Sequence, residues 1–237
     1  MAAGNENGRA AVYDTATGRV LRTIAVKGYS VLSMALSSGG EWLATNDSSG
    51  AVEVWRTDTG ERVSGCLIPE WDGAGLLTFA PNGKILVAAS ADGSALHIIR
   101  PRTGQISTLR GGHNGRINDV VFSNDGGHMA TVGLDAVIRL WSLPNGLPAQ
   151  PRTVSGHTGA IYTATFSPDG KSLLTGGYDG VIRVWDVATF QEVLALSGRW
   201  KRRPISSLQF DRSGATMLST DADGTTRFWN GVATPRK

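Results

Sequence analysis

The sequence has a single cysteine, Cys66, few charged residues and no long apolar run. One cysteine excludes an intrachain disulfide and favours a reducing, cytoplasmic compartment. No basic-then-apolar leader opens the sequence and no apolar stretch of about 18 residues occurs in it, so neither a secretory signal nor a membrane span is predicted. Charged residues make up 18% with a formal net charge of +3, a mild basic excess unlike the composition of a nucleic-acid-binding protein.

Signatures of catalysis and of metal binding are also missing. There is no Gly-x-Ser-x-Gly turn, no glycine-rich phosphate loop and no pair of histidines at metal-ligand spacing. His97 and His128 stand alone and are interpreted as strand or hairpin residues. Cys66 is interpreted as a small apolar residue of an outer strand. We therefore expect no cofactor, no metal ion and no catalytic residue.

Glycine, in contrast, is abundant, with 31 residues, and it punctuates short apolar runs. Between Gly156 and Asp186 the runs 161–166, 172–175 and 181–185 alternate apolar and polar residues, and Asp-Gly turns separate them. Such runs, rich in Val, Ile, Thr and aromatic residues, predict antiparallel strands joined by tight hairpins. A lone three-stranded ribbon cannot bury both of its faces, so the pattern also predicts similar neighbours.

Those neighbours follow at spacings of 42 to 44 residues. The segment 112–142 repeats the pattern closely, and weaker copies precede and follow it. The aligned positions at the end of the third run are Tyr13, Trp55, Ile99, Trp141, Trp185 and Trp229. A period of this length, with Gly-His near the start and Trp near the end of the best copies, is typical of propeller blades.

With these residues the chain resembles the WD40 repeat family over nearly its whole length. The resemblance implies an all-β, WD40-type β-propeller in one domain, residues 1–237, with five full repeat units of strands d, a, b and c. A partial blade is expected at 1–18, and the full units at about 19–60, 61–104, 105–146, 147–190 and 191–231. Because the first residues align with the middle of a blade and keep its pattern, we expect an open or truncated ring. Alternatively, residues 19–25 pair with 225–229 and close five blades.

In family members a hydrogen-bonded tetrad joins a His of the d–a loop, a Ser or Thr of strand b, an Asp of the b–c turn and the Trp of strand c. The resemblance implies two complete structural tetrads: His113, Thr131, Asp135 and Trp141, and His157, Thr175, Asp179 and Trp185. It implies partial tetrads at Thr45 and Trp55, with Ser49 in place of Asp, at Asp92, and at Ser219, Asp223 and Trp229. An Asp-His pair beside Thr is also a possible base and nucleophile. We interpret the set as structural, because it repeats within blades instead of converging on one cleft.

Function is then expected on the surface formed by the d–a loops and b–c turns. The residues predicted to contact a partner there are Tyr29, Trp71, Arg116, Tyr178, Trp200, Lys201, Arg202 and Arg203. Aromatic and Arg side chains are preferred at interface hot spots. We expect a non-catalytic scaffold or sensor platform for a protein or peptide, an acidic one if the cationic residues 199–203 take part.

Three further expectations stay open at this point. A propeller hydrolase or lyase with a central-channel site is one alternative function, and weak nucleic-acid binding through residues 199–203 is another. Self-association through open propeller edges is also expected, and no membrane contact is.

Overall fold

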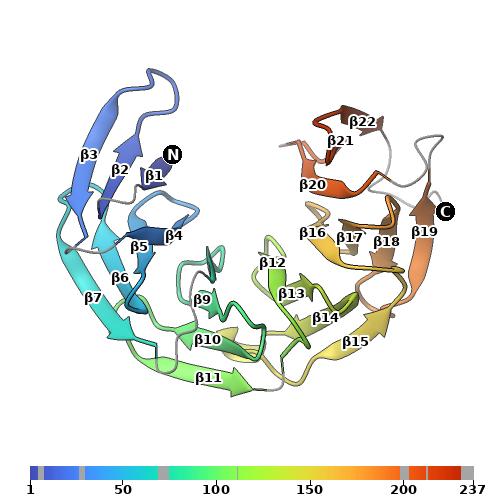
Figure 1. The fold of residues 1–237 in the computed structure, drawn as a ribbon, viewed down its shortest axis with the longest axis horizontal. Helices are drawn as coiled ribbons and strands as arrows, with labels where there is room; N and C mark the ends of the chain where they lie inside the picture. The colour runs from blue at the N-terminus through green and yellow to red at the C-terminus, as the bar shows by residue number, and fades with distance from the viewer. Residues whose placement is uncertain are drawn as a thin grey trace. The chain divides into compact units, whose positions relative to one another are not determined.

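The computed structural model describes residues 1–4, 8–26, 30–68, 75–110, 112–197, 203–211 and 213–230. They form 22 strands in six antiparallel sheets, and Pro144–Gly146 is the one helical element among them, a 3₁₀ turn (Figure 1). The expected all-β class is confirmed. No helix in the described ranges is long and apolar enough to cross a membrane. The chain forms two compact units, Met1–Gly112 and His113–Lys237.

The first unit contains three sheets, which we call the N-terminal blade, blade 1 and blade 2. The N-terminal blade has three strands, β1 (Ala2–Gly4), β2 (Arg9–Tyr13) and β3 (Val20–Ala25). Blade 1 consists of β4 (Val31–Leu36), β5 (Trp42–Asp47), β6 (Ala51–Arg56) and β7 (Arg62–Leu67). Blade 2 consists of β8 (Leu76–Phe79), β9 (Leu86–Ala89), β10 (Ala95–Ile99) and β11 (Ile106–Arg110). Strand β3 pairs with β2, so the first residues of the chain belong to a blade of their own.

The second unit contains blades 3, 4 and 5. Blade 3 consists of β12 (Ile117–Phe122), β13 (His128–Gly133), β14 (Val137–Ser142) and β15 (Arg152–Ser155). Blade 4 consists of β16 (Ile161–Phe166), β17 (Ser172–Gly177), β18 (Ile182–Asp186) and β19 (Glu192–Leu196). Blade 5 has three described strands, β20 (Ile205–Phe210), β21 (Thr216–Asp221) and β22 (Thr226–Asn230).

In every four-stranded blade the strands a, b, c and d lie in chain order and alternate in direction. The d–a loops and b–c turns therefore share one end of a blade, which we call the upper end, and the a–b and c–d turns share the lower end. Strand β16 has the predicted bounds, 161–166. Strand β17 runs two residues beyond the predicted 172–175, because Gly176 and Gly177 still pair with β16.

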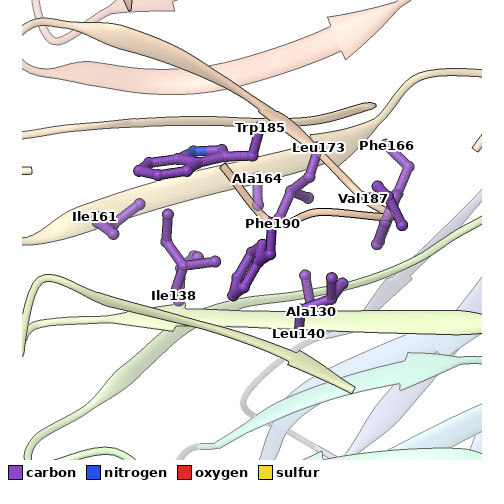
Figure 2. Packing of buried hydrophobic residues seen from close by; sticks show 11 residues of the cluster. Ala130, Ile138, Leu140, Ile161, Ala164, Phe166, Leu173, Trp185, Val187 and Phe190 are labelled. Carbon is purple, nitrogen blue, oxygen red and sulfur yellow. The ribbon is translucent and has the colours of Figure 1, made fainter. Parts of the chain in front are cut away.

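The hydrophobic core lies between successive blades of a unit. In the second unit, Ile138 and Leu140 of strand c in blade 3 share a buried cluster with Leu173 and Trp185 of blade 4 (Figure 2). The same relation recurs between other neighbours, in clusters that join Val12 to Leu43, Val54 to Leu86, and Val184 to Met217. Strand c of the N-terminal blade and of blades 1, 3 and 4 thus buries alternate side chains against the blade that follows it in the same unit, as a two-residue period allows.

Strand β22 is the exception to this burial. Phe228 is 70% exposed, whereas its counterparts on strand c of blades 1 to 4 are between 1% and 3% exposed: Val54, Ile98, Leu140 and Val184. Within the described residues, β22 pairs with β21 alone. Phe228 therefore leaves in water the apolar surface that the equivalent side chains bury.

This contrast predicts different costs for truncating equivalent side chains. Val184→Ala should lower the free energy of unfolding by about 2 kcal/mol, because it leaves a cavity between blades 4 and 5. Phe228→Ala should change it by less than about 0.5 kcal/mol, since little buried area is lost. Urea denaturation followed by far-UV circular dichroism measures both. A Phe228→Ala loss as large as that of Val184→Ala would mean that Phe228 is covered in solution.

Candidate protein-interaction site

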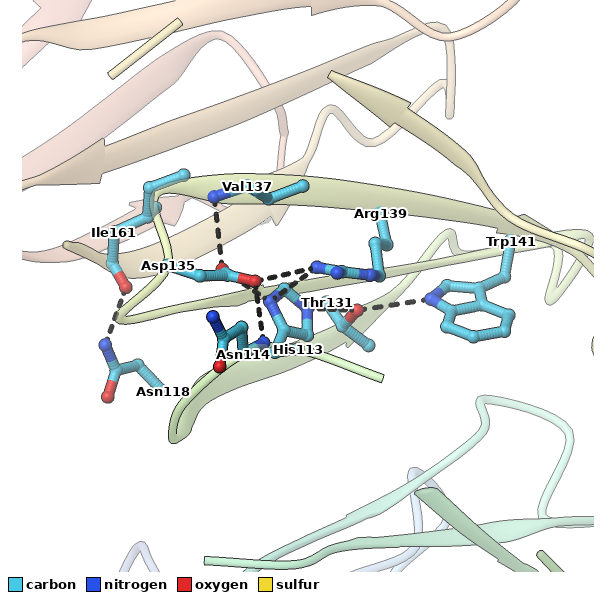
Figure 3. Close-up of polar contacts among 9 residues, drawn as sticks. All are labelled: His113, Asn114, Asn118, Thr131, Asp135, Val137, Arg139, Trp141 and Ile161. Atoms are coloured by element: carbon cyan, nitrogen blue, oxygen red, sulfur yellow. Dashed lines mark hydrogen bonds and ion pairs between the residues drawn. The ribbon is translucent and has the colours of Figure 1, made fainter. Parts of the chain in front are cut away.

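A buried chain of polar side chains crosses blade 3 (Figure 3). The indole Nε1 of Trp141 donates to Thr131 Oγ1 at 3.2 Å, and Thr131 Oγ1 lies 2.9 Å from His113 Nε2. On its other side, His113 Nδ1 lies 2.8 Å from Asp135 Oδ1. A neutral imidazole with its proton on Nδ1 lets Thr131 donate to Nε2 and His113 donate to the carboxylate. The Arg139 guanidinium also lies 2.8 Å from His113 Nδ1 and shares the same carboxylate.

Asp135 connects this chain to the upper end of the blade. Its carboxylate accepts the backbone N–H groups of Asn114, at 3.0 Å, and Val137, at 3.2 Å. It also accepts a hydrogen bond from the guanidinium of Arg139 at 3.1 Å. One carboxylate therefore holds the d–a loop and the b–c turn together.

The electrostatics keep His113 neutral and Asp135 ionised. Burial lowers the pKa of His113, and the nearby Arg139 guanidinium lowers it further, against the opposing influence of Asp135. Burial raises the pKa of Asp135, but hydrogen bonds from His113 and Asn114 outweigh it and hold that pKa below its usual range. Thr131 is fully buried and its oxygen already accepts the indole N–H, so no substrate can reach it as a nucleophile.

Blade 4 repeats the arrangement with similar distances. Trp185 Nε1 donates to Thr175 Oγ1 at 2.9 Å, Thr175 Oγ1 lies 2.8 Å from His157 Nε2, and His157 Nδ1 lies 3.0 Å from Asp179. Burial raises the pKa of Asp179, but the His157 hydrogen bond and charge outweigh it and lower that pKa to about 2. The backbone N–H groups of Thr158 and Val181 complete its shell.

Blades 1 and 5, which have no tetrad His, place an Asp at the end of strand b. Trp55 still donates to Thr45 at 2.9 Å, and Trp229 to Ser219 at 2.8 Å. In blade 1, Asp47 at the end of strand b accepts hydrogen bonds from the N–H and hydroxyl of Ser49. Ser49 thus stands at the position of the tetrad Asp but acts as a donor, and the acid lies two residues earlier, inside the strand.

Blade 5 shows the same substitution. Asp221, again the last residue of strand b, accepts from the backbone N–H of Thr225 at 3.0 Å and from Arg227 at 2.7 Å. Asp223, the expected tetrad acid, instead accepts from the hydroxyl of Thr225 and forms an ion pair with Arg203. In blade 2, Asp92 accepts the backbone N–H of Ser94 within its turn at 2.8 Å.

In blades 3 and 4, which contain the tetrad His, the last residue of strand b is glycine, because a side chain there would collide with the backbone of the d–a loop. A Cβ on Gly133 would lie 2.5 Å from the carbonyl oxygen of Arg116 and 3.3 Å from His113 Nδ1. A Cβ on Gly177 would lie 2.2 Å from the carbonyl oxygen of Ala160. The sequence carried a signal for this, because the position is Gly in blades 3 and 4, which have the His, and Asp in blades 1 and 5, which lack it; blade 2, also without the His, has Ser90 there.

Other reactive side chains form no site in the described ranges. Cys66 is half-buried on β7, and burial raises the pKa of its thiol to about 11. His97 is buried on β10 with its Nδ1 3.1 Å from Thr108 Oγ1. No group of three or more metal-ligating side chains gathers among the described residues.

Three of the residues predicted to contact a partner are described, and all three are exposed at the upper end of the second unit. Tyr178, in the b–c turn of blade 4, is 61% exposed, and a Cβ on Gly159 would touch its ring at 2.9 Å. Arg116 lies before strand a of blade 3, and Arg203 lies before strand a of blade 5. The other five predicted contact residues lie outside the described residues: Tyr29, Trp71, Trp200, Lys201 and Arg202.

Leu134 is a member of this surface that the sequence reasoning missed. It occupies in blade 3 the position of Tyr178 in blade 4, and it is 50% exposed. Its backbone N–H donates to the carbonyl of Arg116 at 3.0 Å. Sequence reasoning missed it because a leucine next to a strand is usually a core residue. Its spacing of one repeat from Tyr178 would have indicated the exposed position.

Comparison with known proteins agrees with the blade geometry. The sequence model of the WD domain, G-beta repeat, matches residues 104–142, 149–186 and 191–230. The chain belongs to the WD40 repeat family. These matches cover blades 3 to 5, in which strand c carries Trp each time, and blade 2 carries Ile99 at this position.

Several curated relatives share these WD40 repeats. The human angio-associated migratory cell protein is 31% identical over 150 residues, which is 61% of this chain and 32% of the relative. The U3 small nucleolar RNA-associated protein 21 homolog of Schizosaccharomyces pombe is 28% identical over 148 residues, 60% of this chain and 16% of the relative. A Xenopus laevis tRNA (guanine-N(7)-)-methyltransferase non-catalytic subunit is 30% identical over 118 residues, 48% of this chain and 29% of the relative. The chain thus spans about a third or less of these relatives.

The tetrad of blade 3 generates a prediction about pH. The unfolded chain protonates its histidines near pH 6.5, whereas the folded protein keeps His113 neutral, so the folded state binds fewer protons. Stability should therefore fall as the pH drops below about 6.5. His113→Gln should reduce this slope by up to about 1.4 kcal/mol per pH unit, a limit that is approached about one unit below pH 6.5.

Urea denaturation at several pH values between about 5 and 7 measures the slope. His128→Gln, on the same blade but outside the tetrad, is the matched control and should retain it. An unchanged slope in His113→Gln would contradict a neutral, buried imidazole.

Proposed function

We propose that this WD40 chain is a non-catalytic platform that binds a protein or peptide partner through the upper end of blades 3, 4 and 5. WD40 repeats and WD-repeat relatives support a protein-interaction scaffold in general. The observation that carries the finer proposal is the pair of exposed apolar side chains, Leu134 and Tyr178, at equivalent positions of adjacent blades. Tyr and Arg are enriched at interface hot spots, and Leu134 adds exposed apolar area to the same end of the blades.

The tetrads support this proposal by fixing the turns that present the pair. Asp135 binds the backbone on both sides of the turn that contains Leu134, and Asp179 does so for Tyr178. Groups held in place before binding lose little conformational entropy on docking. The same tetrads bury the side chains that acid–base chemistry would need, which favours a non-catalytic role.

The charges near the pair favour an acidic partner. Arg116 and Arg203 are exposed at this end, and Arg203 pairs with Asp223, a carboxylate of the chain itself. An acidic segment of a partner could compete for such guanidinium groups. The contribution of Trp200, Lys201 and Arg202 to this surface stays a prediction from the sequence.

The test compares the intact chain with Leu134→Ala/Tyr178→Ala, because truncating two hot-spot side chains should lower partner binding at least tenfold, by about 1.4 kcal/mol or more. The readout is quantitative mass spectrometry of proteins that co-purify with the tagged chain. Val20→Ala/Leu21→Ala removes two similarly exposed side chains from β3 and should leave the bound proteins unchanged. If the Leu134→Ala/Tyr178→Ala variant keeps its melting temperature and co-purifies with the same proteins in the same amounts, this surface does not bind the partner.

Self-association is a second candidate, and the exposure of Phe228 favours it. The equivalent side chains on strand c of blades 1 to 4 are buried. Phe228 is therefore suited to contact a blade of a second copy of the chain. Sedimentation velocity over a range of protein concentrations should show association that Phe228→Ser weakens. Leu67→Ser, which changes a similarly exposed residue of β7, should have no effect. A monomer at every concentration would exclude this candidate.

A further inference from the structure

A groove at the lower end of blades 1 and 2 lies outside the surface proposed above. It has a volume of about 630 Å³, within the range of pockets that hold small ligands or short peptide segments. The a–b turns of both blades and the c–d turn of blade 2 form its walls. The residues that matter for its chemistry are Glu41, Trp42, Lys84, Arg100 and Arg102.

The groove has an aromatic wall and a fixed shape. Trp42 is half-buried, and its backbone N–H donates to Ser37 Oγ at 3.1 Å. The hydroxyl of Ser38 donates to the carbonyl of Pro81 at 2.6 Å, which ties the two a–b turns together. The counterparts of Trp42 at the start of strand b in the other blades are Ile85, His128, Ser172 and Thr216. Blade 1 alone thus places an indole at this position.

The charge of the groove is mainly positive. Lys84, Arg100 and Arg102 are exposed, and none of them forms an ion pair with a residue that the structure describes. Glu41 is the one acidic residue in its lining. The groove therefore holds cationic groups that the described chain leaves uncompensated.

In the equivalent turn of blade 1, a carboxylate of the chain itself neutralises the arginine. This c–d turn begins with Arg56, whose Nε donates to Asp58 Oδ1 at 3.0 Å and whose Nη2 donates to Asp58 Oδ2 at 2.7 Å. One repeat later, Arg100 stands in the place of Arg56, and Arg102 stands in the place of Asp58. The carboxylate that neutralises the turn in blade 1 is replaced in blade 2 by a second guanidinium.

We propose that this groove binds an acidic peptide segment of a partner protein. A carboxylate of that segment takes on Arg100 the position that Asp58 takes on Arg56, while Arg102 and Lys84 hold further acidic groups and Trp42 contacts an apolar side chain. Bidentate pairing between guanidinium and carboxylate supplies both strength and geometry. Nucleic acid is the weaker occupant, because three cations in one groove do not form the extended basic stripe that tracks a phosphate backbone.

The experiment measures fluorescence anisotropy of a labelled glutamate-rich peptide that contains one leucine, with the intact chain. A counterpart peptide with glutamine in place of glutamate should bind at least tenfold more weakly, about what one charge-assisted pair contributes. Binding should also weaken as salt is raised, since exposed charges are screened over about 10 Å at 0.1 M.

The decisive variant is Arg102→Asp, which gives blade 2 the same internal carboxylate as blade 1. It should reduce affinity for the glutamate peptide about tenfold or more without lowering the melting temperature. Arg100→Ser should weaken binding similarly, and Trp42→Leu should weaken binding of the leucine-containing peptide. Lys171→Ser, at the position of Lys84 in blade 4, is the matched control and should bind normally, as should Leu134→Ala/Tyr178→Ala.

The proposal is overturned if the two peptides bind equally, or if Arg102→Asp binds the glutamate peptide as well as the intact chain does. An equal loss in Lys171→Ser would also overturn it, because that would indicate non-specific attraction. Tighter binding of a single-stranded oligonucleotide, lost in Arg100→Ser, would assign the groove to nucleic acid instead. None of these outcomes depends on the upper-end surface, so failure here and failure of the proposed function are distinguishable.

Discussion

The hydrogen bond from the indole of strand c to a hydroxyl of strand b is the interaction on which the rest of the blade chemistry depends. It recurs for Trp55, Trp141, Trp185 and Trp229, with distances between 2.8 and 3.2 Å. A large buried ring with one donor needs one acceptor, and a buried hydroxyl that accepts must still place its own proton. In blades 3 and 4 one ring nitrogen of a His lies next to that hydroxyl, and the other ring nitrogen connects it to an Asp near the surface. A packing requirement deep in the sheet thus determines how firmly the upper turns are held.

The repeat pattern predicted the class of fold and most strands because period-two alternation and Asp-Gly turns are local properties of the sequence. It predicted β16 to the residue, and the resemblance to the WD40 family named the side chains that form the polar chains of blades 3 and 4. Sequence reasoning missed the acid of blade 1, because Asp47 lies inside a strand and its hydrogen bonds go to the turn that follows. It missed the lower groove because turns of two blades, about 44 residues apart, form its walls, and no local pattern reports their meeting.

The two ends of the blades differ in what holds them. At the upper end of blades 3 and 4, charged groups of the chain compensate one another within the tetrads, and Leu134, Tyr178 and Arg116 remain exposed. At the lower end of blades 1 and 2, the turns are tied by hydroxyl-to-carbonyl contacts, and cations remain exposed. Surfaces with such different chemistry suit different partners, which is an advantage for a scaffold made from one repeated unit.

The exchange of glycine for aspartate at the end of strand b has a consequence for how such repeats diverge. Changing Gly177 to Asp while His157 is present would force a Cβ against the carbonyl of Ala160. Losing His157 first would leave Asp179 and Thr175 without their shared partner. A direct exchange between these two blade types therefore favours a paired change at positions 20 residues apart. Blade 2, with Ser90 at the equivalent position and no His, shows that a small polar residue is a third solution, one that needs neither the His nor the acid.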